Sequence, residues 1–288
     1  MPAISPATVK ELRERTSLGL LECKKALKEA DGNIELAIEN LRKISGVKAS
    51  KKAGRIAADG VVATKIAPDN SYGVMVEVNC ETDFVARGED FLSFVDSVVE
   101  TVFLDRQTDT SILAEKLETK RQELVQKLGE NISIRRAELL SGEIIGNYVH
   151  SNKRIAVLVQ LSGGDTEVAK EVAMHVAAVN PRVVNPDDMP KDLLDREREI
   201  IKAQPDMEGK PDSIIEKMVS GRINKFLKEN SLTQQAFIKN PDITVGKLVA
   251  EADAKILSFI RFEVGEGIEV EKVDFAAEVA AQIKASSK

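Results

Sequence analysis

The feature that most constrains this fold is an internal repeat in the centre of the chain, whose two copies lie about 83 residues apart. In the first copy, a predicted hairpin over 60–78 precedes a helix over 90–104; in the second, a hairpin over 144–159 precedes a helix over 166–179. The hairpins read as alternating apolar and polar residues, whereas the helices carry apolar residues at three- and four-residue steps. This pattern predicts an α+β fold whose core has two similar halves, each with an antiparallel sheet.

Further segments complete these halves and interrupt the second one. A helix over 111–128 and a strand over 132–139 are predicted to complete the first half, and a strand over 256–264 the second. Charged helices over 188–204 and 212–228 predict an antiparallel helical hairpin inserted into the second half. The apolar residues expected to face one another in this hairpin are Leu193, Leu194, Ile200 and Ile201 on one helix, and Ile214, Ile215, Met218, Ile223 and Phe226 on the other.

The two ends of the chain are predicted to be helical. Ser5-Pro6 is a helix start, and the breaks at 16–19 and 31–32 leave three short helices, which predict a small bundle. The stretch 42–55 has six basic residues and no acidic one; we interpret it as a solvated linker, with a phosphate-binding segment as the alternative. The expected division is a bundle over 1–45, a linker over 46–56, a first half over 57–140, a second half over 141–181 and 229–267, a hairpin over 182–228 and a C-terminal helix over 268–288.

Residues 79–87 join the second strand of the first hairpin to its helix. They form a strand-to-helix corner, and Thr82 can cap the unpaired N–H groups of the first helical turn. A corner on a rigid scaffold can hold a side chain out towards a partner, which makes Phe84 a candidate contact residue. In the alternative interpretation, Phe84 begins the apolar stripe continued by Phe91 and Phe94, and belongs to the core.

Composition and charge exclude several classes of function. The chain of 288 residues carries 41 basic and 47 acidic side chains, a net charge of −6, and its aromatic content is 4% without tryptophan. Direct binding of nucleic acid is therefore not expected. Cys23 and Cys80 stand in unrelated segments, as in a reducing cytoplasm, and the sequence has neither an apolar run of roughly 18 residues nor a signal peptide.

The sequence does not assemble a recognisable active site. His150 and His175 lack the neighbouring ligands of a metal site, and His175 is expected to be a partly buried helix residue with its hydrogen bonds made. Cys80 paired with a distant histidine is an alternative hydrolase arrangement, but no nucleophile signature surrounds it. We expect a protein without catalytic residues, metal or cofactor, that is, not an enzyme.

The corner also carries a family resemblance. Thr82-Asp83-Phe84-Val85, directly after a Val-Glu-Val-Asn-Cys strand, resembles the signature of the elongation factor Ts family. Other blocks resemble the same family in the same order from end to end: 9–16, 22–27, 57–60, 131–136, 174–178 and 260–267. The resemblance implies an N-terminal bundle like a ubiquitin-associated domain, a helical-hairpin insertion, and a translation elongation factor that is the guanine-nucleotide exchange factor of elongation factor Tu.

The resemblance also implies roles for individual residues. The pair matching Asp83 and Phe84 inserts beside the Mg²⁺ site of elongation factor Tu and promotes GDP release, with Thr82 and Val85 fixing the corner. Further contacts with that GTPase match Arg13, Leu20, Leu21 and His150; the alternatives are a bundle-core role for the two leucines and a solvated turn for His150. A protein-interaction adaptor without exchange activity is the competing function, and a homodimer of the complex is left open.

Overall fold

The computed structural model describes residues 4–269 and contains two three-stranded antiparallel sheets, which confirms the α+β prediction. The first sheet has the order β1-β2-β3, and the second has the order β4-β5-β8. The strands of the first sheet are β1 (Asp59–Ile66), β2 (Tyr72–Cys80) and β3 (Ser133–Ser141). Those of the second are β4 (Ile144–Val149), β5 (Ile155–Ser162) and β8 (Lys255–Glu263).

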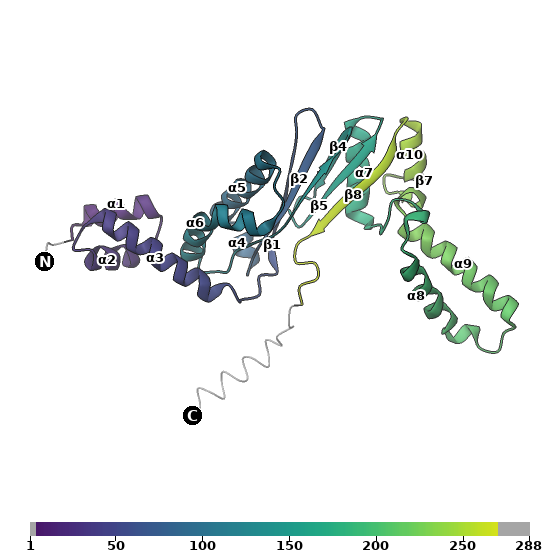
Figure 1. Ribbon diagram of the computed structural model, residues 1–288, viewed down its shortest axis with the longest axis horizontal. Coiled ribbons are helices and arrows are strands. Elements are labelled where there is room, and N and C mark those ends of the chain that lie inside the picture. The colour runs from purple at the N-terminus through teal and green to yellow at the C-terminus, as the bar shows by residue number, and fades with distance from the viewer. Residues whose placement is uncertain (1–3, 270–288) are drawn as a thin grey trace, which may run out of the picture.

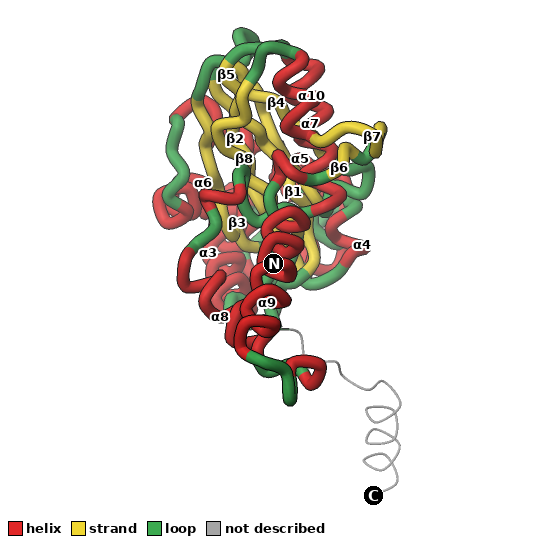
Figure 2. The backbone as a smooth tube through the Cα atoms, turned by 90° about the vertical axis from the view of Figure 1, so that its right-hand side faces the viewer, coloured by secondary structure: helices red, strands yellow, loops and turns green. Residues whose placement is uncertain are grey.

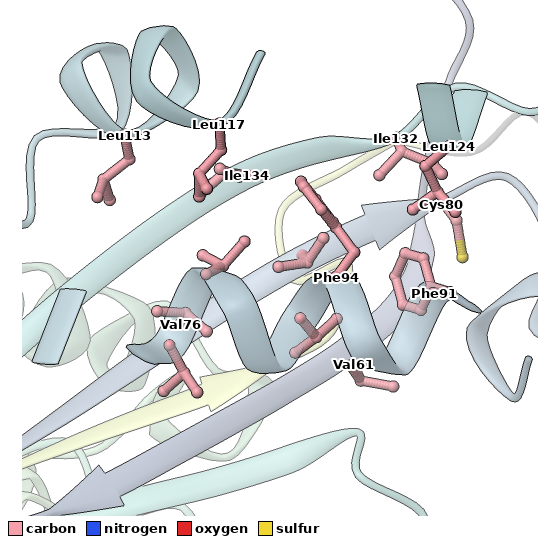
Figure 3. Close-up of a cluster of buried hydrophobic side chains, with 14 of the residues drawn as sticks. Val61, Val76, Cys80, Phe91, Phe94, Leu113, Leu117, Leu124, Ile132 and Ile134 are labelled. Atoms are coloured by element: carbon pink, nitrogen blue, oxygen red, sulfur yellow. The ribbon is translucent and has the colours of Figure 1, made fainter. Parts of the chain in front are cut away.

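The two sheets pack against each other, and helices cover their outer faces (Figure 1). The helices α5 (Glu89–Asp105) and α6 (Thr110–Leu128) cover the first sheet, and α7 (Thr166–Val179) covers the second. Each central strand is therefore buried on both faces: Val76 of β2 points to α5 and α6 (Figure 3), whereas Met75 points to the second sheet. The pleat alternates side chains between faces, so β2 supplies two cores at once.

The two halves meet through equivalent residues, as the subunits of a symmetric dimer do. Asn147 donates a hydrogen bond to Thr64, the residue 83 positions earlier, at 2.6 Å. The same separation relates Val62 to Ile145, and both lie in the cluster between the sheets. On the outer side, Gly146 allows α7 to approach β4, because a Cβ atom there would lie 2.4 Å from the Cβ of Ala169.

The N-terminal bundle consists of α1 (Pro6–Thr16), α2 (Leu20–Glu29) and α3 (Ile34–Lys52), and Ser5 caps α1 by accepting from the N–H of Thr8. The structure differs from the expected linker over 46–56, because α3 continues through this basic stretch to Lys52. The cause is packing: Ala49 is buried in the core of the first half, and Gly46 lies beside Gln122 of α6. The bundle is thus joined to the core by a continuous helix.

The helical hairpin projects from the core at the end opposite the bundle (Figure 1), and seen from that end α8 and α9 extend below the sheets (Figure 2). It contains a short 3₁₀ turn η1 (Pro186–Asp188), α8 (Lys191–Lys202), a turn η2 (Pro205–Met207) and α9 (Asp212–Asn230). Its core consists of Ile201, Met207, Val219 and Ile223. The prediction that Ile200 and Ile214 face the interior of the hairpin is wrong. Both are exposed, because two packed helices bury only one narrow stripe each.

Residues 231–251 form a substructure that the periodicity does not reveal. It comprises η3 (Leu232–Gln234), the short strands β6 (Ala236–Phe237) and β7 (Asn240–Thr244), and α10 (Val245–Glu251). Leu232, Phe237 and Val245 join the core of the second half beside α7. The C-terminal helix expected over 268–288 lies outside the described residues, which end at 269, except for its first two positions.

Candidate functional site: an exposed phenylalanine on a braced corner

The corner after β2 forms a separate one-turn helix, α4 (Asp83–Ala86). Thr82 is its N-cap residue, and its hydroxyl accepts from the N–H of Val85 at 3.4 Å. Phe84 is 83% exposed, whereas Val85 packs against the core of the first half and Ala86 is buried. The interpretation of Phe84 as a core residue is therefore wrong: the corner anchors Val85 and holds the ring of Phe84 in solvent.

The break between α4 and α5 explains why Phe84 leaves the apolar stripe. The helix α4 ends at Ala86, with Arg87 as its C-cap residue, and α5 begins after Gly88. Phe91 and Phe94 of α5 are buried on the first sheet (Figure 3). An uninterrupted helix would place Phe84 one heptad before Phe91 and on the same face. The break removes it from that face.

A carboxylate from a distant segment braces the corner. Glu130 lies between α6 and β3, and its Oε2 atom accepts from the backbone N–H groups of Glu81 and Thr82 at 3.1 and 3.0 Å. Its Oε1 atom accepts from the Thr82 hydroxyl at 2.6 Å. In return, the carboxylate of Glu81 accepts from the N–H of Asn131 at 2.6 Å. Hydrogen bonds to a charged acceptor are roughly twice as strong as neutral ones, so this reciprocal clasp holds the start of α4 firmly.

Asp83 is held only weakly. Its carboxylate pairs with Arg87 one turn later, with an Nη2–Oδ2 distance of 2.7 Å; the Arg87 side chain is exposed and that of Asp83 is half-buried. Such pairs contribute about 0.3–0.5 kcal/mol, so a partner can take over Asp83 at little cost. Asp83 and Arg87 also line a groove of about 440 Å³ that reaches the β4–β5 turn at Asn152 and Lys153. The corner and the second hairpin therefore share one surface.

His150 lies at the β4–β5 turn but lines a different hollow, of about 560 Å³, with Met174, Ile238 and Arg261. Its side chain is exposed, and its Nδ1 atom lies 3.1 Å from the hydroxyl of Tyr148. The structure thus brings the turn, but not the imidazole itself, to the groove beside Asp83.

Arg13, Leu20 and Leu21 flank the turn between α1 and α2, in the N-terminal bundle. Leu20 is 57% exposed and Leu21 82% exposed, so the alternative that places them in the bundle core is wrong. That core instead contains Leu12, Leu18 and Leu27. Arg13 is exposed as well, and the three side chains remain available for a partner.

Cys80 and His175 have environments that suit structural roles. Burial raises the pKa of the Cys80 thiol to about 12, with Glu130 and Asp59 adding to the effect, so the thiolate needed for attack is not formed at neutral pH. His175 is fully buried: its Nδ1 atom accepts from the N–H of Ile238 at 3.2 Å, and its Nε2 atom lies 3.0 Å from Oε1 of Gln235. Burial lowers the pKa of His175, and the hydrogen bond to Gln235 offsets this only in part.

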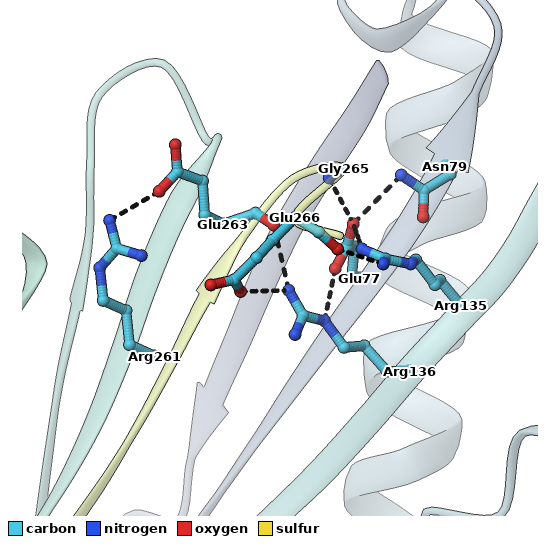
Figure 4. Close-up of polar contacts among 8 residues, drawn as sticks. All are labelled: Glu77, Asn79, Arg135, Arg136, Arg261, Glu263, Gly265 and Glu266. Atoms are coloured by element: carbon cyan, nitrogen blue, oxygen red, sulfur yellow. Dashed lines mark hydrogen bonds and ion pairs between the residues drawn. The ribbon is translucent and has the colours of Figure 1, made fainter. Parts of the chain in front are cut away.

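A buried carboxylate ties the two halves together behind the corner. Glu77 of β2 has no exposed surface, and its Oε1 atom accepts from Arg135 at 3.0 Å and from the N–H of Gly265 at 2.8 Å (Figure 4). Its Oε2 atom accepts from Arg136 at 2.5 Å. Burial disfavours the charged form, but the Gly265 N–H and the two guanidinium groups outweigh it and hold the pKa of Glu77 below its usual range. The end of β8 is thereby fixed to β2 and β3.

Two further observations bound the chemistry of the described residues. Between residues 4 and 269, no group of three His, Cys, Asp or Glu side chains is placed to hold a metal ion. Over the same range, every helix is too short or too polar to cross a membrane.

Sequence reasoning missed Glu130, Glu81 and Asn131. Asn131 falls within a block of family resemblance, and Glu130 follows the glycine that ends α6, so neither position carries a pattern of its own. Glu130 reaches Thr82 across 48 positions. Such a contact leaves no periodic signal in a single sequence.

An exposed aromatic side chain on a rigid scaffold is typical of proteins that bind other proteins. The model of the family described as Elongation factor TS matches residues 81–266. Elongation factor Ts of Cellvibrio japonicus is 64% identical over the full length of both chains, and that of Teredinibacter turnerae is 64% identical over 99% of this chain and 98% of its own. Elongation factor Ts of Photorhabdus laumondii is 53% identical over 99% of this chain and 100% of its own length. The chain belongs to the elongation factor Ts family, a family of translation elongation factors.

Proposed function

We propose that this chain is the guanine-nucleotide exchange factor of elongation factor Tu and acts in the cytoplasm without catalysing a covalent step. It binds the GDP-bound GTPase, promotes release of GDP by disturbing the Mg²⁺ site, and remains bound to the nucleotide-free form. The observation that carries this proposal is the 83% exposed ring of Phe84 on a corner clasped by Glu130, in a chain of this family.

The energetic demand on such a wedge is modest. A tenfold faster release requires about 1.4 kcal/mol of barrier lowering, and a thousandfold faster release about 4 kcal/mol. Full burial of a phenylalanine contributes about 1.5–3 kcal/mol, and the exposed Leu20 and Leu21 add a second apolar contact. Bound nucleotide must weaken binding of the exchange factor by the same factor by which the factor weakens nucleotide binding.

The exposure of the Phe84 ring supports a mechanism in which contact with the GTPase displaces the loops that hold its Mg²⁺ ion. The apolar ring stands outside this protein's own core, so it is buried only when it enters the partner. Asp83 accompanies it as a carboxylate that can leave Arg87. Loops that hold Mg²⁺ in the GTPase would be separated by the ring, and loss of the ion removes charge neutralisation from the phosphates of GDP.

The decisive experiment measures release of a fluorescent GDP analogue from elongation factor Tu by stopped flow, with and without this protein. Concentration-dependent acceleration is expected. Unaccelerated release, together with measurable binding, would support the competing function of an interaction adaptor, for which the exposed Leu20–Leu21 pair on the bundle provides the surface. A homodimer of the complex would appear in the same preparation as a doubled mass in light scattering.

A further inference from the structure

We infer that Glu130 is the positioning residue of the exchange reaction: it touches neither nucleotide nor metal, but sets the direction in which Phe84 leaves the corner. This inference rests on the proposed function for its biological meaning. It goes beyond that function because it assigns a role to a residue outside the Thr82–Val85 corner.

The geometry of the clasp singles out Glu130. One carboxylate accepts from three donors just before α4: the N–H of Glu81, the N–H of Thr82 and the hydroxyl of Thr82. The Thr82 hydroxyl donates to Glu130 and simultaneously accepts from the N–H of Val85, so the hydroxyl that caps the helix is itself oriented by Glu130. Two successive hydrogen bonds therefore connect Glu130 to the N–H of Val85, the residue that directly follows Phe84.

The corner needs such a brace because α4 is too short to hold itself. It has four residues, and a helix of that length is unstable in water. Phe84 contributes nothing to its packing, since the ring is exposed. Val85 and Ala86 supply the inward contacts, and Glu130 fixes the backbone just before them. Without the clasp, α4 would sample other orientations, and the ring would reach its productive position for only part of the time.

The second half of the molecule offers a matched control. Glu143 braces the corresponding corner after β5: its Oε2 atom accepts from the Ser162 hydroxyl at 3.0 Å and from the N–H of Gly163 at 3.1 Å. Removing Glu143 thus breaks a carboxylate clasp of the same chemistry, at a corner that leads into α7.

The test combines exchange kinetics with a measurement on the free protein. Glu130→Ala is expected to lower the maximal rate of GDP release about tenfold, the equivalent of ~1.4 kcal/mol, while the concentration for half-maximal rate changes less than about twofold. Glu130→Gln keeps an acceptor for the two N–H groups and should recover activity to within about threefold of the wild type. Glu143→Ala should leave the maximal rate unchanged. Circular dichroism and thermal unfolding establish that each variant is folded.

A double-mutant cycle separates positioning from any independent contact. In a Phe84→Ala background, Glu130→Ala should reduce the rate no further, because the brace then has no ring to direct. A further tenfold loss in that background would overturn the inference, and so would an undiminished maximal rate for folded Glu130→Ala. An undiminished rate for Phe84→Ala alone would instead overturn the wedge in the proposed function.

The free protein gives a readout that does not depend on the partner. Because the chain contains no tryptophan, Phe84→Trp introduces a single reporter at the corner. Adding Glu130→Ala should lower the fluorescence anisotropy of this indole, whereas adding Glu143→Ala should not. Equal anisotropy in all three proteins would show that Glu130 does not restrain the corner and would overturn the inference even if the wedge is correct.

Discussion

The two halves of the core share a topology but use it differently. In both, the third strand pairs with the second strand of the hairpin, and the register shifts once, between Glu77 and Val78 in the first half and between Gln160 and Leu161 in the second. These sites have the 83-residue separation that relates Thr64 to Asn147. The N-cap residues Thr82 and Asp165 are separated by the same 83 positions. One scaffold therefore occurs twice.

The halves diverge at the residues that follow these shared positions. In the first half, β2 leads into the short α4, a break at Gly88 and an exposed Phe84. In the second half, β5 leads through Gly163 and Gly164 straight into α7. The polar residue before the register shift differs as well: Glu77 binds two arginines, whereas Gln160 accepts from Ser258. The second half shows that the fold does not require a broken corner, so the first corner departs from the shared scaffold without a need of the fold itself.

The largest expected effect tests the difference between Glu77 and Gln160. Glu77→Ala removes the buried carboxylate that accepts from Arg135, Arg136 and the N–H of Gly265, and should lower the free energy of unfolding by about 3 kcal/mol. Gln160→Ala should cost about 1 kcal/mol, the value of one ordinary hydrogen bond. Urea unfolding measures both losses of stability, and equal losses would contradict the expected difference between Glu77 and Gln160.

The next effect tests the two corners directly. Phe84→Ala should slow stimulated GDP release about 100-fold, which corresponds to ~2.7 kcal/mol of transition-state stabilisation, with little change in stability. Glu167→Ala alters the residue 83 positions later and serves as the control, with release expected at the wild-type rate. Stopped-flow release with thermal unfolding of both variants decides between a functional and a structural Phe84.

A third prediction concerns a titrating group of the second half. The pKa of His175 is lowered in the folded state, so this histidine contributes stability that is fully present above its unfolded pKa near 6.5 and is lost as the pH falls towards the folded pKa. The loss reaches at most about 1.4 kcal/mol per pH unit. Urea unfolding between pH 7 and 5 measures it. His175→Gln should flatten this part of the profile, and an unflattened profile would contradict the prediction.

The smallest effect compares the two N-caps. Thr82→Val and Asp165→Ala each remove a side-chain acceptor at a helix start and should each lower stability by about 1 kcal/mol. Only Thr82→Val should also slow GDP release, because it breaks the link to Glu130. If both variants slowed release equally, the kinetic loss would follow stability and not the corner.

The sequence predicted what is local and periodic. It located the hairpins, the core helices and the Thr82 cap, because alternation and three- to four-residue steps record which face is buried. It does not predict that α3 runs to Lys52, because beyond Leu41 only the small residues Ser45 and Ala49 mark the buried face of that helix. The same limit hid Glu130, whose role depends on a partner 48 positions away. The exposure of Phe84 remained open, since spacing alone fitted both core and surface.

The uninterrupted α3 has a consequence for how a partner is recognised. Its 19 residues span about 28 Å, and Asn131, next to Glu130, donates to the carbonyl groups of Ala53 and Arg55 just beyond its end. The Leu20–Leu21 pair of the bundle and the Phe84 corner are therefore held at a fixed spacing by a helix and are not joined by a flexible linker. A protein that matches this fixed spacing can engage both points without the entropy loss of ordering a flexible connection, while one with a different spacing can use only one of them.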